Sequence, residues 1–117
     1  MKLIEMTCVP CRGGEPKLTE EEIAALLPQV PGWEVAEVDG IQQLRRVYKF
    51  KQYLQGLAFT QKVAELAEAQ DHHPAILVEW RKVTVSWWTH VVKGLHQNDF
   101  ISAAKSDALF EQVKGAG

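Results

Sequence analysis

Apolar residues recur every three or four positions in three stretches of the chain, which is the spacing of one helix face. The first stretch opens with Thr19 and Glu22, spaced as a capping box, and ends at Pro28 because proline cannot continue a helix. The second covers about residues 51–70, and the third about residues 97–114. The sequence therefore predicts three helices, of which the second and third are long.

Between the helices, alternating apolar and polar positions predict two pairs of β-strands. The first pair covers residues 33–50 and turns at Asp39-Gly40, a dipeptide typical of a tight hairpin turn in which both positions need a positive φ. The second covers residues 76–88, with Arg81-Lys82 as the predicted turn. The order α-β-β-α-β-β-α predicts an α+β fold, a four-stranded antiparallel sheet with helices packed on one face.

Length and composition place these elements in one domain. The chain has 117 residues, the usual size of a domain, and 46% of them are hydrophobic, which is enough for a core. Residues 1–17 carry proline and glycine and show no periodicity. We therefore expect a flexible N-terminal arm at residues 1–17 and a folded domain at residues 18–117.

Charge and hydropathy exclude some classes of partner. The net charge of −2, with acids and bases mixed along the chain, provides no basic surface for nucleic acid or for an anionic membrane. No apolar run reaches the roughly 18–20 residues of a membrane span. Residues 1–6 are too short and too acidic for a signal peptide. We therefore expect a cytoplasmic protein.

One stretch, residues 68–99, contains every histidine of the chain. Histidine can give and take a proton near neutral pH. Two of the four lie between a predicted helix and Pro74, and a third lies just past a strand, which are positions where functional groups often sit. Spacing alone leaves two interpretations open, solvated turn residues or a group of acid and base side chains. The four are His72, His73, His90 and His96.

The two cysteines, Cys8 and Cys11, have the spacing of half a zinc site, but no second pair follows them. The adjacent residues His72 and His73 are poorly placed to chelate one ion together. A thioredoxin-like function would need a helix that begins at Cys8, and the glycines at 13–14 argue against one. We therefore predict two free thiols and no zinc site.

Tryptophan is concentrated in the second strand pair, at Trp80, Trp87 and Trp88. Adjacent residues of a strand point to opposite faces of the sheet, so either Trp87 or Trp88 faces away from the core. An exposed tryptophan at this place would indicate a surface that binds a partner.

The spacing of the histidines, acidic residues and Trp80 within residues 68–99 resembles the active-site signature of one family, the pterin-4a-carbinolamine dehydratases. This family is also known as the dimerisation cofactor of a homeodomain factor. Shorter pieces, Pro31-Gly32-Trp33 and Phe50-Lys51-Gln52-Tyr53, also look like members of that family. The resemblance covers about residues 18–113. The signature positions are Glu68, His72, His73, Pro74, Trp80, His90 and Asp99.

The resemblance implies a hydro-lyase that removes water from 4a-hydroxytetrahydropterin, the spent cofactor of aromatic amino acid hydroxylases, and leaves quinonoid dihydropterin. It implies a homodimer or homotetramer that needs no metal or cofactor. Losing the hydroxyl requires one proton delivered to oxygen and one removed from the neighbouring ring nitrogen, and histidines can do both. By similarity, His72, His73 and His90 are the catalytic residues.

The resemblance also suggests residues with supporting roles around the histidines. Glu68, Asp71 and Asp99 are candidates for orienting the rings, and Trp33 and Pro74 for contacting the substrate. His96 stands where relatives commonly have serine or threonine, a better helix cap, so we interpret it as a capping or surface residue.

A second function is compatible with the same fold. Relatives also act as interaction proteins, either as a transcriptional cofactor or as an enzyme assembly factor, and fold alone does not decide between these functions. The three signature histidines favour catalysis. The tryptophans and the Cys8–Cys11 segment are the features that would favour a protein partner.

Overall fold

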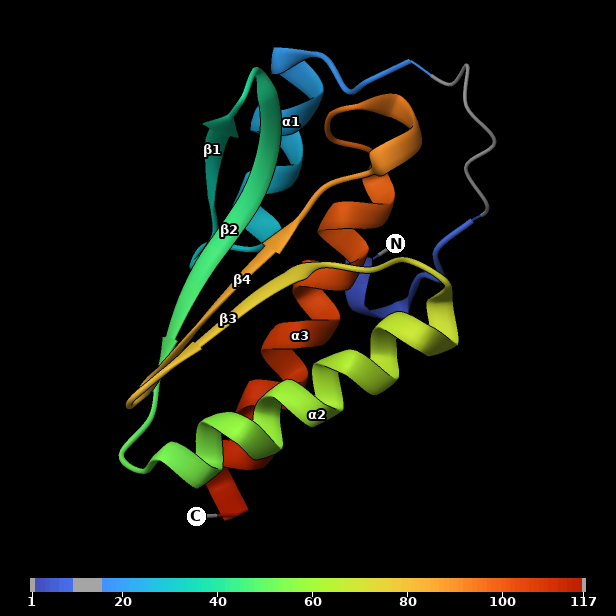
Figure 1. The fold of residues 1–117 in the computed structure, drawn as a ribbon. Coiled ribbons are helices and arrows are strands. Elements are labelled where there is room, and N and C mark those ends of the chain that lie inside the picture. Colours follow the sequence, from blue (N-terminus) through green and yellow to red (C-terminus); the bar gives the residue numbers. More distant parts are fainter. Residues whose placement is uncertain (1, 10–15, 117) are drawn as a thin grey trace.

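The computed structural model of the protein describes residues 2–9 and 16–116. Its order of helices and strands is the predicted order α-β-β-α-β-β-α (Figure 1). The main elements are α1 (Glu20–Leu26), β1 (Glu34–Val38), β2 (Ile41–Lys49), α2 (Tyr53–Gln70), β3 (Ala75–Glu79), β4 (Lys82–Trp87) and α3 (Gln97–Ala116). The described residues also form three short 3₁₀ helices, η1 (Leu3–Glu5), η2 (Leu27–Gln29) and η3 (His90–Val92).

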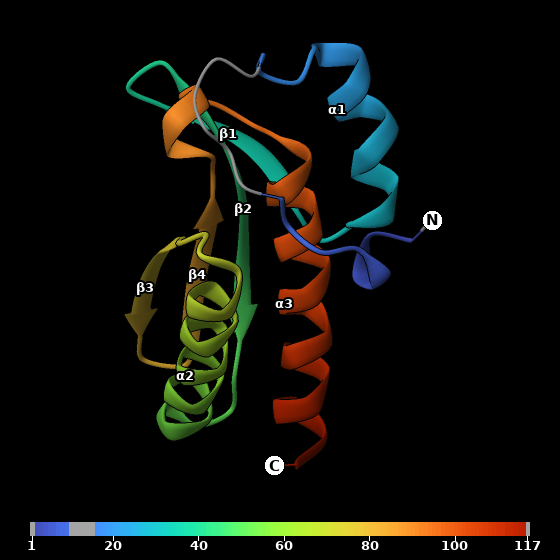
Figure 2. The same cartoon turned by 90° about the vertical axis from the view of Figure 1, so that its right-hand side faces the viewer.

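The strands form one antiparallel sheet in the order β1-β2-β4-β3, which confirms the predicted α+β fold. Helices α2 and α3 pack beside each other against the sheet (Figures 1 and 2). Alternate residues of the two central strands point into this layer because successive side chains of a strand face opposite ways. The buried side chains on that face are Leu44, Tyr48, Val83, Val85 and Trp87. No helix of the described chain is long and apolar enough to cross a membrane.

The first hairpin turns as predicted, and the second turns one residue earlier. Asp39 and Gly40 have φ values of 53° and 79°, which confirms the expected tight turn. In the second hairpin Lys82 pairs with Glu79, so the turn is Trp80-Arg81 and not Arg81-Lys82. Arg81 adopts a left-handed φ of 67°. Nothing in an arginine side chain signals that conformation, so the sequence pattern placed the turn wrongly.

The helix starts follow their capping residues. Thr19 and Glu22 form the predicted capping box at the start of α1. Helix α2 begins at Tyr53, two residues later than expected, because Gln52 and Gln55 form a second capping box there. Gly56 lies in the first turns of α2, where an added Cβ would come within 3.2 Å of a Val83 methyl group. A glycine at this position allows the helix to approach strand β4 closely.

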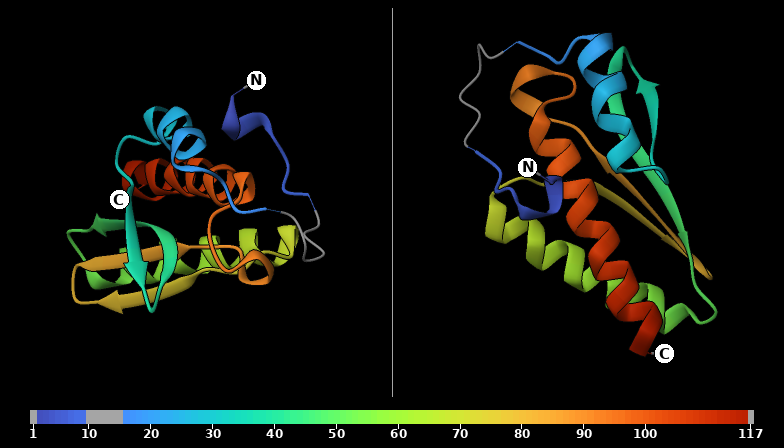
Figure 3. Two further views of the ribbon diagram at one scale, coloured as in Figure 1. Left: turned by 90° about the horizontal axis from the view of Figure 1, so that it is seen from above. Right: turned by 180° about the vertical axis from the view of Figure 1, so that it is seen from behind.

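The described part of the N-terminal segment, residues 2–9, crosses α3 and contacts it through η1 (Figure 3, right). The Leu3 side chain is buried in the core through η1. After the undescribed residues 10–15, the amide of Leu18 donates to the carbonyl oxygen of Leu95 at 2.9 Å. A flexible arm over residues 1–17 stays a prediction, and part of that range has fixed contacts in this structure.

A single carboxylate oxygen joins the first hairpin to α3. Asp107 Oδ1 accepts hydrogen bonds from Trp33 Nε1 at 2.9 Å, from Arg46 Nη1 at 2.7 Å and from the Tyr48 hydroxyl at 2.6 Å. Trp33 and Tyr48 are buried, while Asp107 and Arg46 keep partial contact with solvent. Burial, and next the negative charge of Asp107, raises the pKa of Tyr48 above its usual range.

This shift predicts a loss of stability at high pH. Above about pH 10 the unfolded chain releases the Tyr48 proton while the folded protein keeps it, so the free energy of unfolding falls as pH rises. The Tyr48→Phe variant lacks this contribution. Its free energy of unfolding should therefore fall less steeply with pH, by up to about 1.4 kcal/mol per pH unit. Urea unfolding of both proteins at several pH values between about 9 and 11 measures the difference. Equal slopes for the two proteins would contradict the prediction.

Candidate active site

The end of helix α2 determines where the adjacent histidines lie. Asp71 adopts a left-handed conformation with φ 51°, and its amide donates to the Glu68 carbonyl at 3.4 Å. The amide of His72 donates to the Ala67 carbonyl at 3.1 Å. These two bonds form a Schellman motif, which satisfies the last helical carbonyls and turns the chain sharply. The motif directs residues 72 and 73 away from the helix axis.

His72 is the buried member of the pair. Its Nε2 lies 2.7 Å from Asp99 Oδ1, and Asp99 is fully buried at the start of α3. The imidazole also stacks on Trp87, with ring centroids 5.4 Å apart and an angle of 18° between the ring planes. A hydrogen bond on one edge and an indole against one face hold this ring in a single orientation.

The second oxygen of Asp99 is held as firmly as the first. Asp99 Oδ2 accepts from Thr89 Oγ1 and from the amide of His96, both at 2.9 Å. The His96 ring accepts from the amide of Asn98 at 3.0 Å through Nδ1. His96 therefore caps α3, in agreement with its interpretation as a capping residue, and Asp99 completes the cap while it binds His72.

His73 has a carboxylate partner of its own in a more open place. Its Nε2 lies 2.6 Å from Glu68 Oε2, which is one turn back on α2. The side chains of His73 and Glu68 are 53% and 78% exposed. An ion pair this exposed contributes little to stability, about 0–1 kcal/mol. Glu68 therefore orients the ring without anchoring the fold.

His90 enters the site from the loop after β4. This loop is closed by hydrogen bonds between the backbones of Thr89 and Gly94, and Lys93 adopts a left-handed φ of 55°. The exposed His90 ring packs on Trp88, with centroids 4.7 Å apart. Of the two adjacent tryptophans, Trp87 is fully buried, and Trp88 faces away from the core to support His90.

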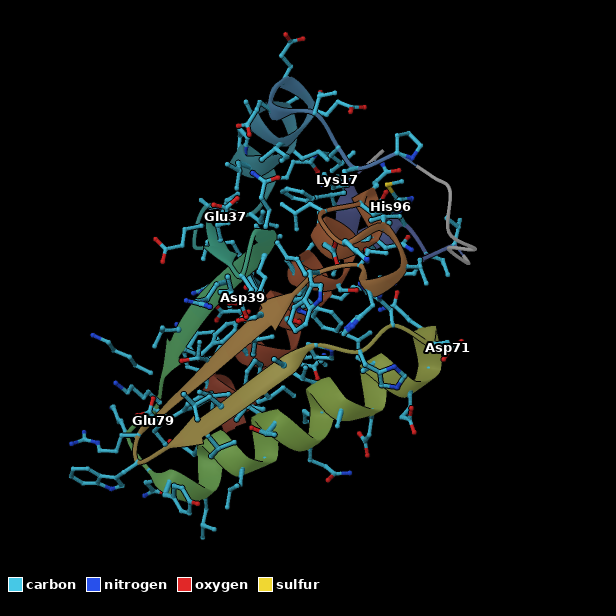
Figure 4. All side chains as sticks on the ribbon, turned by 45° about the horizontal axis from the view of Figure 1, so that its top comes forward. Lys17, Glu37, Asp39, Asp71, Glu79 and His96 are labelled. Atoms are coloured by element: carbon cyan, nitrogen blue, oxygen red, sulfur yellow. The ribbon has the colours of Figure 1, made fainter. Side chains whose placement is uncertain are left out.

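These elements enclose a cavity of about 440 Å³. Figure 4 shows Asp71 and His96 at the end of the molecule that holds it, with Glu79 at the far end of the sheet. Gln70 also lines the cavity, and its Oε1 is buried with no hydrogen-bond partner among the described residues. The lining residues are Cys8, Val9, Gln70, Asp71, His72, His73, Thr89, His90, Val91 and Asn98.

The structure brings most of the predicted site residues together. His72, His73, His90 and Asp71 line the cavity, with Asp99 and Glu68 hydrogen-bonded to the first two rings. Pro74 does not line this cavity, although it directs the chain out of the α2 end. Trp33 does not line it either, because its indole is bound to Asp107 in the core.

Sequence patterns did not indicate Cys8, Val9, Gln70 or Asn98 as cavity residues. They come from the N-terminal segment, the last residue of α2 and the first turn of α3, which only folding brings together. Within residues 2–9 and 16–116, no three His, Cys, Asp or Glu side chains are grouped so that they could hold a metal ion. Cys11, the other half of the predicted thiol pair, lies outside the described residues.

Comparison with known proteins identifies relatives along most of the chain. A family model described as "Pterin 4 alpha carbinolamine dehydratase" matches residues 16–109. A protein of Syntrophotalea carbinolica named "Putative pterin-4-alpha-carbinolamine dehydratase" is 52% identical over 110 residues. These residues make up 94% of this chain and 98% of that protein.

Two solved structures share the fold. A transcriptional coactivator/pterin dehydratase from Brucella melitensis has a TM-score of 0.72 and 33% identity, covering 80% of this chain and 97% of that one. A pterin dehydratase-like protein described as a RuBisCO assembly factor in the alpha-carboxysome has a TM-score of 0.58 and 24% identity. The match covers 68% of this chain and 89% of that protein. On the strength of the family match and the 52% identical relative, the chain belongs to the pterin-4a-carbinolamine dehydratase family.

Proposed function

We propose that this protein dehydrates 4a-hydroxytetrahydropterin to quinonoid dihydropterin by histidine acid and base catalysis, as a hydro-lyase. The observation that carries the proposal is the convergence of His72, His73 and His90 on one cavity, in a chain of this family. The cavity volume of about 440 Å³ lies in the usual range of sites for small molecules, roughly 300–1,000 Å³.

The carboxylate partners determine which ring nitrogens are available for proton transfer. An ionised carboxylate only accepts hydrogen bonds, so Nε2 of His72 donates to Asp99 and Nε2 of His73 donates to Glu68. In each neutral ring the lone pair is then on Nδ1, which is the atom that can take a proton. Each ring can later release that proton as an imidazolium while Nε2 remains bound to its carboxylate.

The reaction needs one proton donor and one proton acceptor. A histidine in the imidazolium form gives a proton to the 4a-hydroxyl oxygen as the carbon–oxygen bond breaks. A neutral histidine takes the proton from the adjacent ring nitrogen, whose electron pair forms the new carbon–nitrogen double bond. Water leaves, nothing is oxidised or reduced, and each proton transfer contributes about 10²–10⁴-fold to the rate.

Two further residues support binding of a pterin. Gln70 Oε1 is a buried acceptor on the cavity wall, and a pterin ring carries several N–H donors. A buried acceptor without a partner costs about 1–3 kcal/mol, so a ligand that supplies the missing donor is favoured. We further propose that Asp71, which lines the cavity beside the histidines, contributes to binding of the polar ring edge.

The test follows the decay of freshly generated 4a-hydroxytetrahydropterin by rapid-mixing absorbance. The wild-type protein is expected to shorten the decay in proportion to its concentration, and heat-denatured protein at the same concentration is the control. Decay no faster than in buffer, from protein whose circular dichroism shows it to be folded, would disprove the proposed activity.

A protein partner is a second candidate role, favoured by one observation. Trp80 and Leu77 are 75% and 57% exposed at the β3 edge of the sheet, and large exposed apolar side chains mark interaction surfaces. We propose that this edge forms the contact in a homodimer or homotetramer, or binds another protein. We also propose that the enzyme is cytoplasmic. Such a role is compatible with catalysis because it uses the other end of the sheet.

A further inference from the structure

The N-terminal segment contributes two residues to the wall of the active-site cavity. Cys8 and Val9 line it together with the histidines. Both precede residue 16, where the match to the family model begins. This part of the cavity wall therefore lies outside the region that the family model describes.

Asn98 fixes the backbone of this segment. Its Nδ2 donates to the Val9 carbonyl at 2.7 Å, and its Oδ1 accepts from the Val9 amide at 3.0 Å. The side-chain amide thus pairs with both polar groups of one residue, as a neighbouring β-strand would. Asn98 is only 3% exposed and lies one residue before Asp99, the partner of His72. Two adjacent residues of α3 therefore hold the two sides of the cavity, because Asn98 binds the N-terminal segment and Asp99 binds His72.

The Cys8 side chain is also held in place. Its Sγ lies 3.5 Å from Ser102 Oγ and 3.6 Å from the Asn98 carbonyl oxygen. Ser102 Oγ in turn accepts from Gln70 Nε2 at 3.5 Å, which connects the thiol to another cavity residue. Burial raises the pKa of the Cys8 thiol, so at neutral pH it is an uncharged wall group and not a reactive thiolate.

We infer that Cys8 and Val9, held by Asn98, contact the bound pterin and limit the size of the substituent that the cavity accepts. This inference rests on the proposed function for the identity of the ligand. It makes Val9 a specificity-determining residue. The physical basis is steric. Asn98 makes two hydrogen bonds to the Val9 backbone, so the segment cannot move away from a larger substituent without losing them.

The experiment compares Val9→Trp with Thr7→Trp. Thr7 is also exposed on this segment but does not line the cavity, so Thr7→Trp is a matched control. Two substrates are used, one with a methyl group and one with a three-carbon side chain at C6 of the pterin. Val9→Trp is expected to raise KM roughly tenfold for the larger substrate and less for the smaller one, with kcat unchanged. Thr7→Trp is expected to leave both values unchanged.

A second variant and a binding measurement keep the two proposals separable. Val9→Gly removes the side chain and is expected to narrow the difference in KM between the two substrates. Binding of a stable dihydropterin, measured by quenching of tryptophan fluorescence, needs no turnover. If Val9→Trp weakens dihydropterin binding, Thr7→Trp does not, and wild type shows no turnover, then the inference about Val9 is supported and the dehydratase proposal is disproved. Two results would disprove the inference that Cys8 and Val9 contact the pterin. One is that Val9→Trp and Thr7→Trp have equal KM and Kd, and the other is that wild type does not bind the dihydropterin.

Discussion

Replacing His72 with alanine is expected to lower kcat for dehydration by about 10²–10⁴-fold, the usual contribution of one general acid or base. Of the three cavity histidines, His72 is the one held on two sides, by Asp99 and by the face of Trp87. A ring fixed in this way presents its free nitrogen to a bound substrate in one position. Catalysis depends on such positioning, and other side chains cannot easily replace it.

The matched control is His96→Ala. His96 is in the same loop region, but its ring caps α3 and does not line the cavity. This variant should lose about 1 kcal/mol of stability through the weaker cap and keep its activity. Single-turnover absorbance traces of wild type, His72→Ala and His96→Ala at one pH measure the comparison. If His72→Ala is folded and as active as wild type, His72 has no catalytic role.

Replacing Asp107 with alanine is expected to lower the free energy of unfolding by about 3 kcal/mol. The substitution removes the carboxylate that accepts three hydrogen bonds. Two of the donors, Trp33 Nε1 and the Tyr48 hydroxyl, are buried and lose this acceptor. Each buried donor left unpaired costs about 1–3 kcal/mol. The partly exposed Arg46 adds less, since water can solvate its guanidinium group.

Glu111→Ala is the matched control for this substitution. It removes a carboxylate one turn further along α3, which makes an exposed ion pair with Lys114 at 3.6 Å. Its cost should stay below about 1 kcal/mol. Urea unfolding at a fixed protein concentration measures both variants, because any association would make stability depend on concentration. Equal midpoints for the two variants would show that the three-donor cluster does not stabilise the fold.

Several elements could be predicted because residues close in sequence encode them. Thr19 and Glu22 carry their own capping box, and Asp39-Gly40 carries its own turn. The error at the second hairpin has the opposite cause. The pairing of Glu79 with Lys82 decides that turn, and pairing is a property of two strands together and not of the turn residues.

The same distinction applies to the site. Glu68 and His73 are five residues apart, and one helix end with its Schellman motif brings them together. Asp99 and His72 are 27 residues apart and meet only because α3 begins beside the end of α2. The sequence could name Asp99 as an orienting residue by resemblance, but it could not assign this carboxylate to one particular histidine.

By itself, the sequence determined the order of helices and strands, the family, and the three histidines of the cavity. Only the tertiary structure decided that Trp33 binds Asp107 instead of lining the cavity, and that Cys8 and Val9 line the same cavity as the three histidines. Local elements follow from hydrogen bonds and apolar periodicity within a few residues. The cavity depends on packing between segments far apart in the sequence, such as Val9 and Asn98, which are 89 residues apart, and no local pattern encodes such contacts.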